Sequence, residues 1–251
     1  MDCNILNPNK DYWDAYAELW VERATALPDY GVGMSEDDLH LFGDVSGKKL
    51  LDICCGSGHS LQYHADRGAA ELWGLDISRS QLELADKYLK SHNYTAKLIC
   101  APMEAEAGIP KNYFDYVYSV YGIGWTTDLD GTFRKIASYL KKSGTFIFSW
   151  HHTLNYCVAF SIPERKVVLE DGKLVFHRSY FDESWFQLPV DDTEVTLCNR
   201  KISTYVNALA GAGFAVEQMI EQPDQSIGDD SDRAKKNKML PMSVCFKARK
   251  L

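Results

Sequence analysis

The sequence predicts an α/β fold in which a mostly parallel sheet carries helices on both faces. Short apolar segments alternate with helix-like segments through the first 150 residues, as in repeated strand–helix–strand units. Two apolar segments, which end at Asp52 and Asp76, lie on either side of a glycine-containing turn. The alternation breaks over residues 151–198 and resumes near residue 200. Together these observations predict one α/β domain with an inserted segment.

Local signals place the individual elements. Apolar residues recur at helical spacing between Trp13 and Val21, which predicts a helix over 10–26. Ser78 is a suitable N-cap for another helix, and Gly144 would end a helix that carries lysines in its last turn. In chain order, further helices are predicted over 57–67, 78–90, 130–142 and 200–212, and strands over 48–54, 71–76, 96–100, 114–120, 144–150, 214–221 and 242–250.

Residues 151–198 are rich in aromatic residues and carry strand signals. Residues 166–169 and 174–176 flank an Asp171-Gly172 turn, which predicts a β-hairpin. We expect this β-rich segment to be a cap inserted over the functional site.

The turn at residues 50–60 predicts a nucleoside site. Gly56 and Gly58 allow a sharp turn and close approach of the backbone to a ligand. Asp76 ends the next strand, where a carboxylate can accept both ribose hydroxyls. The third glycine of a dinucleotide fingerprint is missing, and Asp52 would repel a pyrophosphate but could hold an ammonium group. These features suit a nucleoside with a cationic amino-acid tail and no phosphates, as in S-adenosylmethionine.

Five segments in order resemble the class I S-adenosylmethionine-dependent methyltransferases. They are LDICCGSGHS, GLDIS, residues 101–104, residues 114–120 and residues 140–149. Cys54 and Ser60 stand where the family's first motif usually has glycines. The resemblance implies a Rossmann-like, seven-stranded, mostly parallel sheet with an antiparallel last strand.

The resemblance also implies which residues hold S-adenosylmethionine and its product S-adenosylhomocysteine. The turn after the first strand would face the methionine part, Asp52 its ammonium, and a tyrosine of the N-terminal helix its carboxylate. The second strand would hold the ribose, the loop after the third strand the adenine, and the end of the fourth strand would lie where the methyl group emerges. The candidates for cofactor binding are therefore Tyr16, Asp52, Cys54, Gly56, Ser57, Gly58, Asp76, Ile77, Met103, Glu104, Ser119 and Val120. Glu104 could equally be solvated, and Ser119 could equally be a turn residue.

The acceptor would lie beyond the ends of the fourth and fifth strands. The candidates for acceptor binding are Tyr12, Tyr121, Trp125, His151 and Tyr180. His151 and His152 are the candidate catalytic bases, because a histidine at this edge could take a proton near neutral pH. Adjacent residues of an extended chain point in opposite directions, so at most one of the two is expected to face the site. A histidine bonded to a loop carbonyl is an equal alternative, and the cap aromatics could instead form the cap's own core.

Composition limits the remaining choices. The 251 residues suit a single domain, in which residues 1–30 are expected to form a helical lid and residues 151–198 the cap. The net charge of −8 argues against nucleic acid as a partner, and the basic cluster at 233–238 is expected to be a solvated part of a polar loop over 222–241. No signal peptide or membrane span is evident, which favours a cytoplasmic location. The seven cysteines have no C-x-x-C spacing, so we expect reduced thiols and no metal site.

The resemblance therefore implies a methyltransferase, and we expect it to act on an oxygen, nitrogen or sulfur nucleophile of a small molecule. One alternative is a non-catalytic protein that binds S-adenosylmethionine or S-adenosylhomocysteine. Another is RNA methylation, which the charge disfavours, as does the tetrapeptide SVYG where exocyclic-nitrogen methyltransferases usually carry N/D-P-P-Y/F. The missing third glycine disfavours a nicotinamide oxidoreductase.

Overall fold

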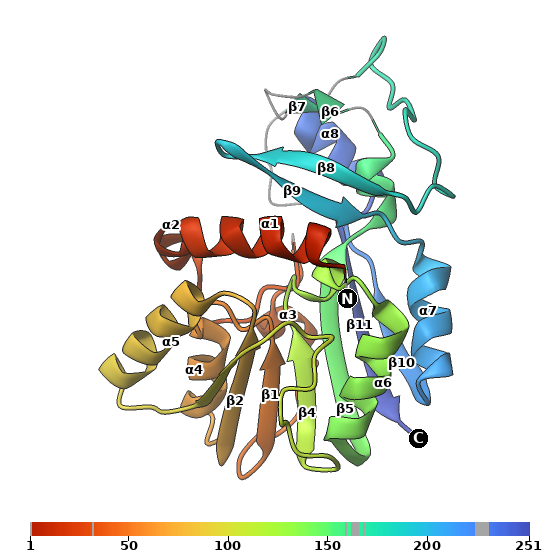
Figure 1. Cartoon of the computed structure of the whole chain (residues 1–251). Coiled ribbons are helices and arrows are strands. Elements are labelled where there is room, and N and C mark those ends of the chain that lie inside the picture. The colour runs from red at the N-terminus through yellow and green to blue at the C-terminus, as the bar shows by residue number, and fades with distance from the viewer. Residues whose placement is uncertain (1, 32, 159, 162–165, 168, 224–230) are drawn as a thin grey trace.

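The computed structural model describes residues 2–31, 33–158, 160–161, 166–167, 169–223 and 231–251. Seven strands form one sheet in the order β10-β11-β5-β4-β1-β2-β3 (Figure 1). These strands are β1 (Lys49–Ile53), β2 (Glu71–Asp76), β3 (Lys97–Cys100), β4 (Phe114–Ser119), β5 (Leu140–His151), β10 (Phe214–Ile220) and β11 (Ser243–Lys250). Neighbours from β3 to β5 pair in parallel, whereas β11 pairs antiparallel with both β5 and β10. The predicted sheet and its antiparallel last strand are confirmed.

Eight α-helices accompany the sheet in the described part of the chain. They are α1 (Cys3–Ala15), α2 (Ala17–Arg23), α3 (Glu36–Leu39), α4 (His59–Asp66), α5 (Arg79–Ser91), α6 (Leu129–Tyr139), α7 (Ile202–Gly211) and α8 (Asp232–Met239). Ser78 caps α5 as predicted, since its side chain accepts a hydrogen bond from the backbone N–H of Gln81 at 3.1 Å.

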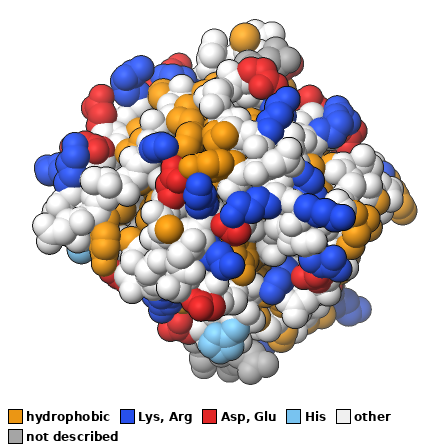
Figure 2. Space-filling view, turned by 90° about the horizontal axis from the view of Figure 1, so that it is seen from below, with side chains coloured by type: hydrophobic (Ala, Val, Ile, Leu, Met, Phe, Trp, Pro, Cys, Tyr) orange, Lys and Arg blue, Asp and Glu red, His pale blue; other side chains and the backbone are white. Residues whose placement is uncertain are grey.

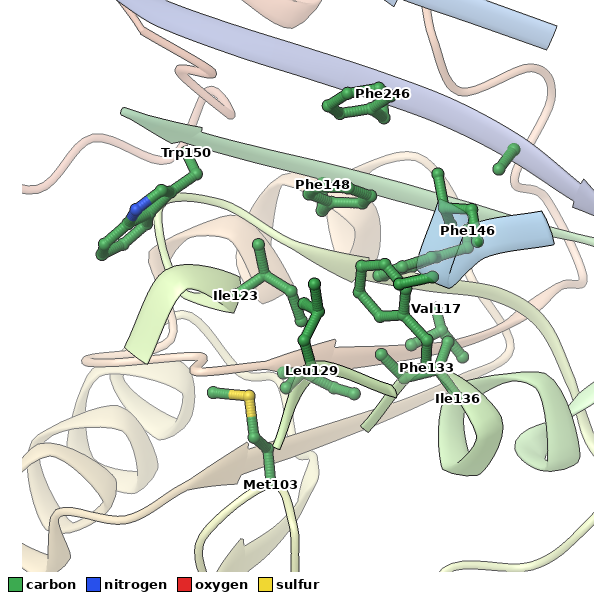
Figure 3. Close-up of a cluster of buried hydrophobic side chains, with 14 of the residues drawn as sticks. Met103, Val117, Ile123, Leu129, Phe133, Ile136, Phe146, Phe148, Trp150 and Phe246 are labelled. Atoms are coloured by element: carbon green, nitrogen blue, oxygen red, sulfur yellow. The ribbon is translucent and has the colours of Figure 1, made fainter. Parts of the chain in front are cut away.

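The alternation of side chains along each strand builds two apolar cores. Leu50 and Ile147 belong to the core that α4 and α5 cover, whereas the next residue along each strand, Leu51 or Phe148, belongs to the other core. Helices α6 and α7 cover that second core. Figure 3 shows it between α6, β5 and β11, where the labelled side chains include Phe133, Ile136, Phe146, Phe148 and Phe246. Helices therefore cover both faces of the sheet. This packing holds the carboxyl ends of the parallel strands in place.

Three predicted boundaries were wrong. Helix α6 ends at Tyr139 and not near Gly144, because Leu140 already pairs with Phe114 as part of β5. The predicted helix over 10–26 begins at Cys3 and is interrupted at Tyr16, which separates α1 from α2. The polar segment over 222–241 is not all loop, because it contains α8.

Residues 151–198 contain two small antiparallel strand pairs. Strand β6 (Phe160–Ser161) pairs with β7 (Lys166–Val167), and β8 (Trp185–Val190) pairs with β9 (Thr193–Cys198). The predicted hairpin is only partly present. The Asp171-Gly172 turn is closed by a bridge between its neighbours Glu170 and Lys173, but residues 166–167 pair with β6 and not with residues 174–176; position 168 lies outside the described residues. Helix α1 lies between the sheet and the β8–β9 pair (Figure 1).

Basic and acidic side chains alternate on the face at which the parallel strands begin. Figure 2 shows this face, with lysine and arginine interspersed among aspartate and glutamate. Glu71 binds Lys49 at 3.6 Å and Lys97 at 2.9 Å, and Asp115 binds Lys141 at 2.8 Å. These positive charges are therefore compensated locally. None of the described helices is long and apolar enough to span a membrane.

Candidate active site

A cavity of about 610 Å³ lies at the carboxyl ends of the parallel strands. This size falls within the range of typical small-molecule sites, roughly 300–1,000 Å³. The turn after β1 and the loops after β2, β3 and β4 form one side of the cavity, whereas α1, α2, β8 and β9 contribute the opposite side. The carboxyl edge of a parallel sheet is where open α/β folds bind ligands.

The turn after β1 has the backbone geometry of a ligand cradle. Cys54, Gly56 and Gly58 have φ angles of 66°, 50° and 80°, which lie in the left-handed region. At Gly58, a Cβ atom would lie 3.0 Å from the Cβ of Ala85, so glycine also allows α4 and α5 to pack closely. The backbone N–H of Gly56 donates to Oδ2 of Asp76 at 2.9 Å, which ties the turn to the end of β2.

Asp52 presents a buried carboxylate beside this turn. The residue is 2% exposed and lines the cavity. Its Oδ2 accepts a hydrogen bond from the Ser60 hydroxyl at 2.5 Å, whereas Oδ1 has no hydrogen-bond partner among the described residues. Burial raises the pKa of this carboxyl to about 8, against the hydrogen bonds from Ser60 and Tyr118. An ammonium group that reached Oδ1 would satisfy both the unused acceptor and the buried charge.

Asp76 closes the other side of the cradle. Its two oxygens accept backbone N–H groups of Gly56 and Ser78, both at 2.9 Å. A carboxylate offers about four acceptor positions, so it can still accept two hydroxyl groups. Burial raises the pKa of Asp76 to about 6, against these backbone hydrogen bonds. Gln81 also lines the cavity, and its buried Oε1 has no partner in the described part of the chain. The residues present therefore fit a nucleoside with a cationic tail.

Glu104 connects two loops that line the cavity. Its Oε1 accepts hydrogen bonds from the Thr126 hydroxyl at 2.7 Å and from the backbone N–H of Thr127 at 2.6 Å. Glu104 is therefore not simply solvated. Oε2 is not used in these hydrogen bonds, which leaves it available to a ligand.

Aromatic side chains form the other part of the cavity. The ring of Trp125 lies 5.5 Å from that of Trp13 and 5.4 Å from that of Trp150 between centroids. His151 contacts Tyr121 and Tyr156, with ring centroids 5.0 and 5.4 Å away. Burial, and secondarily the charge of Lys236, lowers the pKa of His151 to about 4, so the ring is neutral near pH 7.

The structure brings most of the predicted site residues to the cavity. Its lining includes Tyr12, Asp52, Cys54, Gly56, Ser57, Asp76, Ile77, Met103, Glu104, Val120, Tyr121, Trp125 and His151. It does not include Tyr16, Gly58, Ser119, His152 or Tyr180. Tyr180 packs against Phe181, and their ring centroids are 5.5 Å apart.

His152 differs from His151 in its surroundings. Its Nδ1 accepts the backbone N–H of Leu154 at 3.1 Å, so Nε2 carries the proton of the neutral ring and donates to Oε1 of Glu221 at 2.7 Å. Only one of the two adjacent histidines thus lines the cavity, as the extended chain predicts.

The contacts that hold α1 in place were not predicted from the sequence. Asp14 accepts hydrogen bonds from the hydroxyl of Ser78 at 2.6 Å and from the backbone N–H of Ser80 at 3.1 Å, which ties α1 to the start of α5. The amide side chain of Asn9 exchanges two hydrogen bonds with the backbone of Thr196 in β9, at 2.8 and 2.9 Å. Trp13 and Trp20 line the cavity from this side and also pack against the apolar core.

Comparison with known proteins adds to this geometry. A family model described as "Methyltransferase domain" matches residues 50–144. An uncharacterized protein of Haemophilus influenzae is 32% identical over 193 residues, which cover 73% of each chain. The demethylmenaquinone methyltransferase of Lactococcus lactis is 32% identical over 158 residues, which cover 60% of this chain and 61% of that enzyme. The match therefore spans less than two thirds of the Lactococcus enzyme.

A solved structure agrees in fold. The S-adenosylmethionine-dependent methyltransferase from Mesorhizobium loti superposes with a TM-score of 0.67 at 23% identity, over 84% of this chain and 95% of that one. The segment that the family model matches carries the turn after β1, Asp76 and Glu104.

Proposed function

The chain belongs to the class I S-adenosylmethionine-dependent methyltransferases, and on this premise we propose that it methylates a small, largely apolar molecule. The acceptor would bind in the aromatic part of the cavity and offer an oxygen, nitrogen or sulfur nucleophile. The observation that carries the proposal is that one cavity contains both the polar cradle at Asp52 and Asp76 and the aromatic wall at Trp125 and His151. The name of the Lactococcus relative, which refers to a quinone, is consistent with an apolar acceptor.

We propose that the polar cradle holds the cofactor. Asp76 would accept the ribose hydroxyls, Asp52 the ammonium group, and Met103 and Glu104 would lie against the adenine. When bound, the cofactor supplies an electrophilic methyl group on a sulfonium sulfur. The chain then has to align a nucleophile with that methyl group and exclude water, since in-line displacement needs little more than orientation.

Residues 1–30 would act as a lid and residues 151–198 as a cap over the acceptor. Helix α1 is bonded to α5 through Asp14 and to β9 through Asn9, so it connects the cofactor cradle to the cap. Neutral His151 would accept a hydrogen bond from the acceptor and orient its lone pair. As the bond to carbon forms, the proton on the nucleophile becomes acidic, so even a weak base can remove it.

Asp52 should couple cofactor binding to proton release. A pKa of about 8 leaves this carboxyl mostly protonated at pH 7, whereas an ammonium group binds the ionised form. We expect binding of S-adenosylmethionine at pH 7 to release close to one proton, and affinity to rise with pH up to about 8 by at most about tenfold per pH unit. Calorimetry in two buffers of different ionisation enthalpy measures the release.

The matched variants for this prediction are Asp52→Asn and Asp86→Asn. Asp86 is an exposed carboxylate on α5, with a side chain 52% exposed, so its loss should not change the proton count. Proton release that is the same in Asp52→Asn as in the wild type would contradict the assignment of Asp52.

The class of acceptor is tested by following a labelled methyl group. The protein is incubated with methyl-labelled S-adenosylmethionine and, separately, with total RNA, total protein and the organic-soluble small molecules of a cell extract. We expect label to enter the organic-soluble fraction, and this transfer to fall at least tenfold in Asp76→Ala at a cofactor concentration below saturation. Label confined to RNA or protein would contradict the proposed acceptor class.

A further inference from the structure

We propose that Lys236 makes the site selective for acceptors that carry a negatively charged group, such as a carboxylate on an apolar body. The inference rests on the proposed function, because it concerns the acceptor end of the same cavity. Lys236 lies on α8, within the segment that the sequence suggests is a solvated loop.

Lys236 is a buried cation whose hydrogen-bond partners are neutral. The residue is 1% exposed, and its Nζ donates to the carbonyl oxygen of Asn155 at 3.0 Å and to its Oδ1 at 2.6 Å. No carboxylate pairs with it in the part of the chain that the structure describes. Burial of an ammonium group without a counter-charge is costly, and burial accordingly lowers the pKa of Lys236 to about 8. A negative charge nearby would offset this cost.

The acceptor end of the cavity lies next to this cation. Asn155 belongs to the short 3-10 helix η2 (Thr153–Tyr156), and the neighbouring Tyr156 lines the cavity beside His151. The positive charge of Lys236 acts on His151 at this end of the cavity, because it adds to burial in lowering the pKa of His151. Charges act over longer distances in a poorly solvated interior than in water. An anionic group beside Tyr156 would therefore be stabilised without touching Lys236.

The other charges at the cavity are arranged differently. Arg23 and Asp29 line it as well, but both are exposed, so water and salt screen them. Arg23 also lies over the ring of Trp20, 5.2 Å from its centroid. The buried carboxylates Asp52 and Asp76 lie in the cofactor cradle, where an ammonium group would neutralise one of them. Arg200 is buried as well, and its guanidinium donates to the carbonyl oxygens of Gly124 at 3.1 Å and of Thr126. Lys236 is the buried cation that is bonded to the segment carrying Tyr156.

The test compares two probes that differ in charge and little in shape, phenylacetate and phenylacetamide. Trp13, Trp20, Trp125 and Trp150 line the cavity, so quenching of tryptophan fluorescence reports binding to the full-length protein saturated with S-adenosylhomocysteine. We expect phenylacetate to bind about tenfold more tightly than phenylacetamide, a difference of about 1.4 kcal/mol. Lys236→Met should reduce the preference to less than twofold and leave the affinity for phenylacetamide within twofold.

Controls separate charge from folding. Lys238→Met removes the same charge from an exposed position on α8 and should keep the full preference, and Lys236→Arg should retain it in part. Thermal unfolding and S-adenosylhomocysteine binding verify that each variant is folded. Binding of both probes without preference in the wild type, or a preference that survives Lys236→Met but disappears in Arg23→Gln, would overturn the inference alone. Failure of both probes to bind a protein that binds S-adenosylhomocysteine would contradict the proposed function as well.

Discussion

Replacing His151 by phenylalanine should lower kcat about a hundredfold, because proton removal by a positioned side chain contributes at least about that factor. Phenylalanine keeps a ring against Tyr121, Trp150 and Tyr156, which surround His151. The cavity should therefore keep its shape, and KM for S-adenosylmethionine should stay within about twofold. Steady-state kinetics with an acceptor from the labelled fraction measures both parameters.

The pH profile gives a second test of His151. Because its pKa is about 4, His151 is almost entirely in the neutral, proton-accepting form near neutral pH. The contribution of His151 to kcat should therefore be constant from about pH 6 to 8 and should fall only as the pH drops toward 4 and the ring becomes protonated. In His151→Phe this acid limb should be absent.

The matched control is His177→Phe, because the side chain of His177 is 51% exposed and pairs with Glu170. Its kcat should stay within twofold of the wild type. A His151→Phe variant with the kcat of the wild type would remove this residue from the mechanism and leave orientation of the acceptor to the aromatic wall.

Replacing Asp76 by alanine should weaken binding of S-adenosylmethionine at least tenfold, or about 1.4 kcal/mol. The two ribose hydroxyls would lose their carboxylate acceptor, and hydrogen bonds to charged groups contribute roughly 1.5–3 kcal/mol each. The variant also removes the acceptor of the Gly56 N–H, which holds the turn in place. Calorimetry measures the affinity, and thermal unfolding verifies the fold.

Two further variants distinguish the causes of this loss. Asp76→Asn keeps the shape of the side chain and one carbonyl acceptor, so its affinity should lie between those of the wild type and Asp76→Ala. Asp86→Ala removes an exposed carboxylate from α5 and should bind as the wild type does. Wild-type affinity in Asp76→Ala would place the ribose elsewhere in the cavity.

Local sequence signals were sufficient for the parallel part of the fold. Strand β2 occupies the predicted residues 71–76, and Ser78 caps α5 as predicted. Short apolar runs, glycines and N-cap residues act within a few positions, so one sequence is enough to read them. The boundary between α6 and β5 was misplaced because pairing of Leu140 with Phe114 overrides the helical preference of the lysines that follow.

Long-range contacts could not be predicted in this way. Asn9 bonds to Thr196, and these residues are 187 positions apart in the chain. Buried Lys236 bonds to Asn155, 81 positions earlier in the chain. In the sequence, Lys236 is one of several lysines in a polar segment, and only the packed structure distinguishes it from exposed Lys238. Residues 1–30 and 151–198 are therefore where sequence reasoning was least complete.

Calorimetric titration of the wild-type protein with S-adenosylmethionine, S-adenosylhomocysteine and NAD tests the central claim most directly. The polar cradle predicts one binding site per chain for each of the first two ligands and none for NAD, because Asp52 lies where a pyrophosphate would come. Binding of NAD, or failure of both S-adenosyl ligands to bind, would contradict the assignment of Asp52 and Asp76 to the cofactor.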